Sequence, residues 1–264
     1  ETGSVGKAMD ERIGNGVEVS QQLARNILQP VDEDARLLAR MLLRPARDAS
    51  LAVLRPKDGW PAASRALVAT DFIGRPIILV SGLSLHAGAL EADPRCSLLV
   101  GRSGKGDPLA HPRMTAFATA RPIAKDSGEA EAVRERFLSR HPKAELYVDF
   151  PDFRFLCLEA ESAALNGGFA KAFELAPSDL LDEPVDDLSA SAIRARDHMN
   201  EDHGDAIDAL AAMNGEDGNG WKIATADRRG FEIIKGDRLD RSEFNSDPVG
   251  EGGYRKSVVE LGRE

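Results

Sequence analysis

The spacing of hydrophobic positions changes along the chain, and each change predicts a different kind of structure. Over residues 32–43, apolar side chains recur close to the spacing of an amphipathic helix, at Ala35, Leu37, Leu38, Met41 and Leu42. Acidic residues lie in its first turn and arginines follow, as the helix dipole favours, and Pro45 comes directly after it. The pattern predicts one helix ahead of the first strand.

Residues 49–175 contain short apolar runs bounded by glycine, proline and aspartate, a pattern typical of strands joined by turns. Two helices, at residues 84–92 and 129–139, interrupt these runs without the strict strand-helix alternation of a parallel sheet. We therefore expect an α+β protein built on a small antiparallel barrel. The predicted strands are residues 51–54, 64–69, 77–80, 97–100, 114–122, 153–165 and 170–175.

Residues 177–189 are acidic and contain two prolines, which is typical of a linker between domains. The part beyond the linker is predicted to form a helix over residues 191–213, strands at 222–227 and 230–235, and a last helix over 254–262. The expected organisation is a disordered leader at residues 1–30, a barrel domain at 31–178 and a small α/β domain at 189–264.

Composition and charge narrow the classes of function. The 264 residues are 42% hydrophobic, enough for a packed core, and the net charge of −10 argues against nonspecific binding to nucleic acid. No apolar run approaches the roughly 18 residues that span a bilayer, and no secretory signal is evident. Cys96 and Cys157 lie in apolar runs, which favours buried free thiols in a reducing compartment. We expect a cytoplasmic protein with neither a nucleic-acid nor a membrane partner.

A candidate phosphate-binding site combines Arg65, in an apolar strand, with Ser84 and His86 at the start of a helix. An arginine binds phosphate bidentately, and the free amides and dipole of a helix start favour an anion. Plainer interpretations stay open: Arg65 is then an outward-facing strand residue, Ser84 an ordinary helix cap and His86 a solvated helix residue.

Other motifs are weaker. Residues 101–107 lack the glycine spacing of a phosphate-binding loop and are predicted to form a hairpin turn. Residues 198–203 are rich in histidine and carboxylate, but on a continuous helix His198 shares a face with Asp202 and lies well apart from His203. This favours a structural polar face, and we predict no metal site. Paired glycines at 167–168 indicate a break between strands, from which Lys171 reaches either the same pocket or solvent.

Four stretches follow one another in a particular order: Ser64-Arg65, residues 83–99, the turn at 167–172 and the motif at 198–203. In this order they resemble the flavin-binding split-barrel proteins related to pyridoxamine 5′-phosphate oxidase, and among them the heme-utilisation (HugZ-type) branch. The resemblance covers most of the chain from about Asp34 onward.

The resemblance implies a six-stranded antiparallel split barrel that dimerises through the barrel, with FMN in the groove between subunits and a small α/β domain following. Two features differ from the family pattern. Leu85 and His86 stand where the oxidases have basic residues, and the last histidine is His203, whereas heme-degrading members ligate iron through a histidine near the C-terminus. The cofactor-binding residues implied by the resemblance are Ser64, Arg65, Ala66, Ser84, Leu85, His86 and Lys171.

Three functional hypotheses follow. The first is an FMN-dependent oxidoreductase acting on a small molecule, in which the flavin supplies the redox chemistry. The second is a heme-binding or heme-degrading protein. The third is a noncatalytic regulator that keeps the barrel and has lost the cofactor. Catalytic residues are not assigned in any of them.

Overall fold

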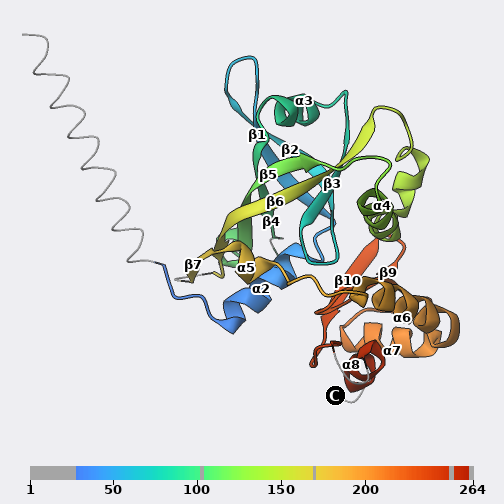
Figure 1. Cartoon of the computed structure of the whole chain (residues 1–264). Coiled ribbons are helices and arrows are strands. Elements are labelled where there is room, and N and C mark those ends of the chain that lie inside the picture. The colour runs from blue at the N-terminus through green and yellow to red at the C-terminus, as the bar shows by residue number, and fades with distance from the viewer. Residues whose placement is uncertain (1–27, 102–103, 169–170, 250–252, 262–264) are drawn as a thin grey trace, which may run out of the picture.

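The computed structural model describes residues 28–101, 104–168, 171–249 and 253–261. It consists of a β-barrel and a smaller part, here called the C-terminal unit (residues 188–261), which lies beside one end of the barrel (Figure 1). Each part has its own cluster of buried hydrophobic residues. The predicted leader, up to residue 27, lies outside the described residues.

The barrel is antiparallel throughout, and six of its strands close on themselves. The strand order is β3-β2-β1-β4-β5-β6, and β3 also pairs with β6, so the sheet has no open edge at this point. A short seventh strand, β7, extends the sheet beyond β6. This confirms the six-stranded barrel predicted above. The strands are β1 Asp48–Leu54, β2 Pro61–Thr70, β3 Pro76–Ser81, β4 Arg95–Val100, β5 Arg113–Pro122, β6 Phe153–Asn166 and β7 Ala172–Leu175.

Alternation of side chains determines which residues form the barrel core. Leu51 on β1 pairs with Leu98 on β4, which pairs with Ala116 on β5, and all three are buried. Along each strand, the residues next to these three point outward. They include the small Ser97 and the aromatic Phe117. The barrel is therefore apolar inside and, across these strands, weakly polar outside.

Four helices of the described chain pack on the barrel. Asp32 caps the first turn of α2, which confirms the predicted helix. The residues it buries are Ala35, Ala39 and Leu43, whereas Leu37 and Met41 of the predicted apolar positions are exposed. Helix α3 follows β3 directly, and α4 contacts both β2 and the first strand of the C-terminal unit. The helices of this part are α2 Glu33–Leu43, α3 Leu85–Ala92, α4 Gly128–Arg140 and the short α5 Pro177–Leu180, with 3₁₀ turns at Pro108–Ala110 and Pro142–Leu146.

The C-terminal unit packs three helices against a three-stranded antiparallel sheet of order β10-β9-β8. Its core includes the buried residues Ile207, Trp221, Phe231 and Ile233. With the barrel, it completes the predicted α+β fold. Its elements are α6 Leu188–Asp202, α7 Gly204–Met213, β8 Lys222–Ala226, β9 Gly230–Lys235, β10 Arg238–Glu243 and α8 Gly253–Leu261.

Two sequence predictions for this unit are wrong. The helix expected over 191–213 is two helices, because the backbone leaves helical geometry at His203 (φ −131°, ψ 36°). The third strand, β10, was not predicted, because its sequence is largely polar and contains a single aliphatic residue, Leu239.

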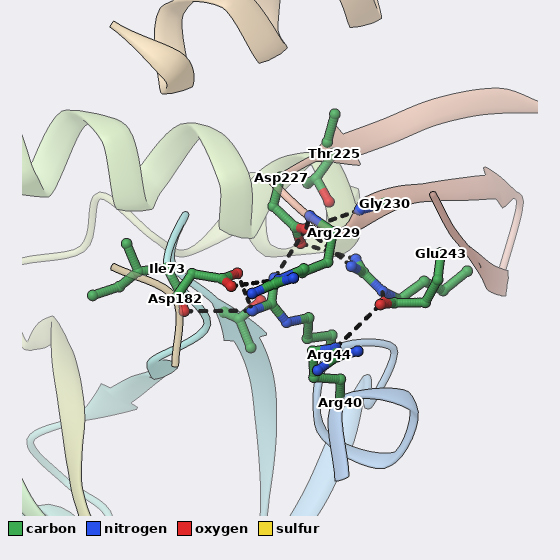
Figure 2. A network of polar contacts seen from close by, with 12 residues as sticks. Arg40, Arg44, Ile73, Asp182, Thr225, Asp227, Arg229, Gly230 and Glu243 are labelled. Carbon is green, nitrogen blue, oxygen red and sulfur yellow. Dashed lines mark hydrogen bonds and ion pairs between the residues drawn. The ribbon is translucent and has the colours of Figure 1, made fainter. Parts of the chain in front are cut away.

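A buried network of charges joins the C-terminal unit to the barrel (Figure 2). Arg44, from the end of α2, lies 2.7 Å from Asp182 and 2.9 Å from Asp227, and Arg241 lies 2.9 Å from the same Asp227 carboxylate. All four side chains are at most 3% exposed. Asp182 belongs to the acidic segment expected to be a linker, so this segment is held in place at Asp182.

Candidate functional site

The residues singled out in the sequence lie in three places. On β2, Ser64 pairs with the fully buried Leu51 and faces the barrel interior, as does Ala66. Arg65, between them, points outward: its side chain is 83% exposed and lies 3.7 Å from Asp48. Period-two alternation therefore separates Arg65 from its two neighbours.

Ser84 and His86 lie at the turn from β3 into α3, beside Ser64. The Ser84 hydroxyl caps α3 by accepting from the Ala87 amide at 3.3 Å, and it donates to the Ser81 carbonyl at 2.8 Å. His86 Nδ1 is hydrogen-bonded to Ser64 Oγ at 3.1 Å. The sequence prediction that Ser84 begins a helix is confirmed.

The Ser64–His86 pair is a contact between neutral groups. Burial lowers the pKa of His86, so its imidazole is uncharged at neutral pH. Within the described part of the chain, no carboxylate contacts His86, so it lacks the orienting partner that activates a serine nucleophile. Leu85, between Ser84 and His86, is 55% exposed and offers an apolar side chain beside them.

Lys171 lies at the opposite end of the barrel. Ser81, just before α3, pairs with Phe153, the first residue of β6, whereas Ala172, just after Lys171, pairs with Asn166, the last residue of the same strand. In Figure 1, α3 and β7 accordingly mark the two ends of the barrel. A single copy of the chain therefore brings Ser64, Ser84 and His86 together and keeps Arg65 and Lys171 apart from them. The roles of all these residues in cofactor binding stay predictions.

The outward surface of β1, β4 and β5 carries a groove that the sequence analysis missed. It has a volume of about 590 Å³ and is here called the outer-face groove (Ala52, Leu54, Pro61, Ser97, Phe117). Ala52 pairs with Ser97, and Ser97 pairs with Phe117, so two small side chains lie next to one exposed aromatic ring. The sequence holds one signal of this surface. A strand that faces solvent on one side usually alternates apolar with charged residues, but the run Ser97-Leu98-Leu99 has no charge on either face.

Two charged residues are among those that line this groove. Arg95 and Glu161 line it, and Arg95 is bound by Asp93 at 3.0 and 2.6 Å. Arg65 lies one row further along the same outer surface, because its partner Ser50 is two residues from Ala52 on β1. The arrangement is a flat apolar floor with guanidinium groups beside it, which suits a planar ligand that carries acidic substituents.

In the C-terminal unit, the break between α6 and α7 brings two histidines together. The Nε2 atoms of His198 and His203 lie 3.3 Å apart, and His198 Nδ1 lies 3.0 Å from Asp202 Oδ2. The prediction that His198 and Asp202 share a face is confirmed. The prediction that His198 and His203 lie well apart is wrong, because it assumed a continuous helix through residue 203.

The closed antiparallel barrel followed by a small α/β unit defines the class as a split-barrel protein. Residues 30–180 match the family described as CREG, beta-barrel, and the chain belongs to this family. The resemblance to split-barrel proteins of the heme-utilisation branch is thereby confirmed at the level of family and fold.

Three similar proteins place the chain within this class. It is 32% identical over 157 residues to the non-canonical chloroplastic heme oxygenase HOZ of Arabidopsis thaliana. The matched region is 58% of this chain and 47% of the relative, so the chain spans about half of that relative's length. A protein of unknown function from Agrobacterium tumefaciens has a structure with 30% identity and a TM-score of 0.77, covering 88% of this chain and 98% of that one. The heme binding protein from Mycobacterium smegmatis is 25% identical, with a TM-score of 0.53, covering 89% and 97%.

Proposed function

We propose that this protein binds heme and that the outer-face groove holds the macrocycle. The observation that carries the proposal is the floor of the groove, where Ala52 and Ser97 leave a shallow surface beside the ring of Phe117. A porphyrin is flat and apolar except for two carboxylates, and the rim offers Arg95, with Arg65 one row away. Similarity to a heme oxygenase and to a heme binding protein supports the same ligand.

A homodimer is part of this proposal. The groove is open on one side, and the surface around it exposes Leu54, Leu67, Leu99 and Phe117, each between 37% and 44% exposed. An apolar surface of this kind is stabilised when a second copy covers it, and the same contact encloses a ligand lying in the groove. The two buried free thiols are consistent with the reducing, cytoplasmic location that we include in the proposal.

A flavin-dependent oxidoreductase is the second candidate, and one observation favours it. Among the described residues that line the outer-face groove there is no histidine or tyrosine to ligate iron, and the thiol of the lining Cys96 is buried with its pKa raised to about 11. An isoalloxazine ring needs no such ligand, and Arg65 provides an exposed guanidinium for the phosphate of FMN. If neither compound binds, the noncatalytic regulator hypothesis is the one that survives.

Titration of the purified protein with hemin and, separately, with FMN distinguishes these candidates. We expect hemin to bind to the wild type and Phe117→Glu to weaken binding in the groove by about tenfold or more, because it puts a charge into an apolar contact. Leu146→Glu is the matched control, since Leu146 is 79% exposed and lies outside the groove. Unchanged hemin stoichiometry and affinity in Phe117→Glu would contradict the proposal, and tight binding of FMN alone would favour the second candidate.

A further inference from the structure

A large cavity lies in the C-terminal unit, away from the barrel. It has a volume of about 910 Å³, is lined by α6, α7 and α8, and is open to solvent beside His198, whose side chain is 62% exposed. Cofactor sites commonly measure about 300–1,000 Å³ and are mainly apolar, so this cavity is large enough for a drug-sized or larger planar ligand. Its apolar wall includes Met199, Ala206, Leu210, Met213 and Val258.

His198 and His203 line this cavity, and the contact with Asp202 determines which nitrogen of His198 is free. A carboxylate only accepts hydrogen bonds, so in neutral His198 the hydrogen resides on Nδ1, 3.0 Å from Asp202. Nε2 then carries the lone pair and accepts from His203 Nε2–H at 3.3 Å. A carboxylate behind Nδ1 is the arrangement that orients a metal-ligating histidine and makes it more basic.

A bare metal ion finds too few ligands here. Within the described residues, no group of three or more histidine, cysteine or carboxylate side chains is placed to hold a metal ion. An iron porphyrin carries four of its own nitrogen ligands and needs only one histidine from the protein. The pair of histidines in an apolar cavity therefore fits an iron porphyrin better than a free ion.

Two arginines complete the site. Arg194 lies one helical turn before His198, and Arg255 lies on α8, and both line the cavity. Neither forms an ion pair with a carboxylate in the part of the chain that the structure describes, whereas most arginines around the barrel do. Arg194 donates to the Ser191 hydroxyl at 2.9 Å, so its charge is not offset by a carboxylate. Two guanidinium groups without carboxylate partners match the two propionates of a heme.

We infer that this cavity is a second heme site, separate from the outer-face groove, with His198 Nε2 as the iron ligand and Asp202 as the residue that positions it. The site stands on its own residues and does not require heme in the groove. His203 holds the free His198 ring through its Nε2 hydrogen bond until iron takes the lone pair.

The test is a hemin titration of the full chain followed by absorption spectroscopy. Wild type is expected to develop the spectrum of histidine-ligated ferric heme, and His198→Ala is expected to lose it and to bind hemin about tenfold more weakly. Added imidazole restores the ligated spectrum in His198→Ala, because it supplies the missing nitrogen to the cavity. Glu201→Gln, an exposed substitution on the same helix outside the cavity, is the control for folding.

Asp202→Asn tests the positioning role separately. We expect hemin still to bind but the ferric/ferrous midpoint potential to rise, because a neutral amide makes the imidazole a weaker donor to ferric iron. Metal-free protoporphyrin is expected to bind wild type and His198→Ala alike. The inference is overturned if His198→Ala shows the wild-type ligated spectrum without imidazole. The titration also separates the two proposals, since Phe117→Glu should keep this spectrum even where binding in the groove is lost.

Discussion

The guanidinium group of Arg140 donates to the carboxylate of Glu232 at 2.9 Å, and both side chains are fully buried. Arg140 ends α4 on the barrel and also donates to the carbonyls of Arg44 and Ala46, while Glu232 lies on β9 and accepts from Thr225. The pair therefore joins the barrel to the C-terminal unit through contacts that water does not screen. Together with Arg44 and Asp227, it fixes the orientation of the two parts.

Removing one member of this pair should be strongly destabilising. We expect Glu232→Ala to lower the free energy of unfolding by about 3–5 kcal/mol, because it leaves a buried guanidinium without its carboxylate. Asp237→Ala breaks an ion pair with Lys143 that is more than 70% exposed on both sides, so it should lower the stability far less than Glu232→Ala does. Urea unfolding curves measure both, and similar losses for the two variants would show that the buried pair does not join the two parts.

Because of Asp227, the stability of the protein should change with pH in the acid range. Burial by itself raises the pKa of its carboxyl, but Arg241 and Arg44 outweigh burial and hold the pKa well below its usual range. Such a group stabilises the fold above its unfolded pKa of about 3.9 and loses that contribution as the pH falls further. We expect Asp227→Asn to be less stable than wild type at pH 7. Below about pH 4, the urea midpoint of the variant should change less with pH than that of wild type. Parallel profiles for the two proteins would rule this out.

His141 should make the stability depend on pH in a higher range than Asp227 does. Burial lowers its pKa to about 4, against the opposing effect of the hydrogen bond that its Nε2 donates to the Val68 carbonyl at 2.8 Å. Since an unfolded histidine has a pKa of about 6.5, the contribution of neutral His141 is complete above that value and is lost as the pH falls toward 4. The urea midpoint of His141→Gln should therefore change less than that of wild type between pH 7 and pH 4.5. An NMR titration that gives His141 an ordinary pKa would contradict this expectation.

The two thiols should be unreactive in the folded protein. Cys96 and Cys157 are free and buried, as the sequence predicted, and burial raises the pKa of each to about 11. Because only the thiolate reacts, iodoacetamide at pH 8 should leave both unmodified in buffer and alkylate both in urea. Mass spectrometry counts the adducts, and rapid modification of either cysteine in the native protein would show that it is accessible.

The sequence predicted the barrel well because the barrel depends on local patterns. Short apolar runs bounded by turn residues locate its strands, and the charges at the two ends of the first helix, with the proline after it, locate that helix. β10 was missed because its polar sequence is stabilised by distant partners, as when Arg241 binds Asp227. Contacts between residues that are far apart in the chain cannot be derived from periodicity.

The candidate sites were predicted less completely, for two reasons. Arg65 was grouped with Ser84 and His86 although alternation alone places it on the opposite face of β2 from Ser64, so this separation could have been anticipated. The contact between His198 and His203 could not, because it depends on a helix break at His203 that no proline indicates, and Gly204 was the only hint.

The most direct test of heme binding in the outer-face groove is the position of iron in crystals grown with hemin. An anomalous difference map recorded at the iron edge is predicted to show a peak over Ala52, Ser97 and Phe117, in a groove covered by a second copy of the chain. A map of hemin-bound crystals without iron in this groove would contradict the account, even if a peak beside His198 showed that the C-terminal unit binds heme.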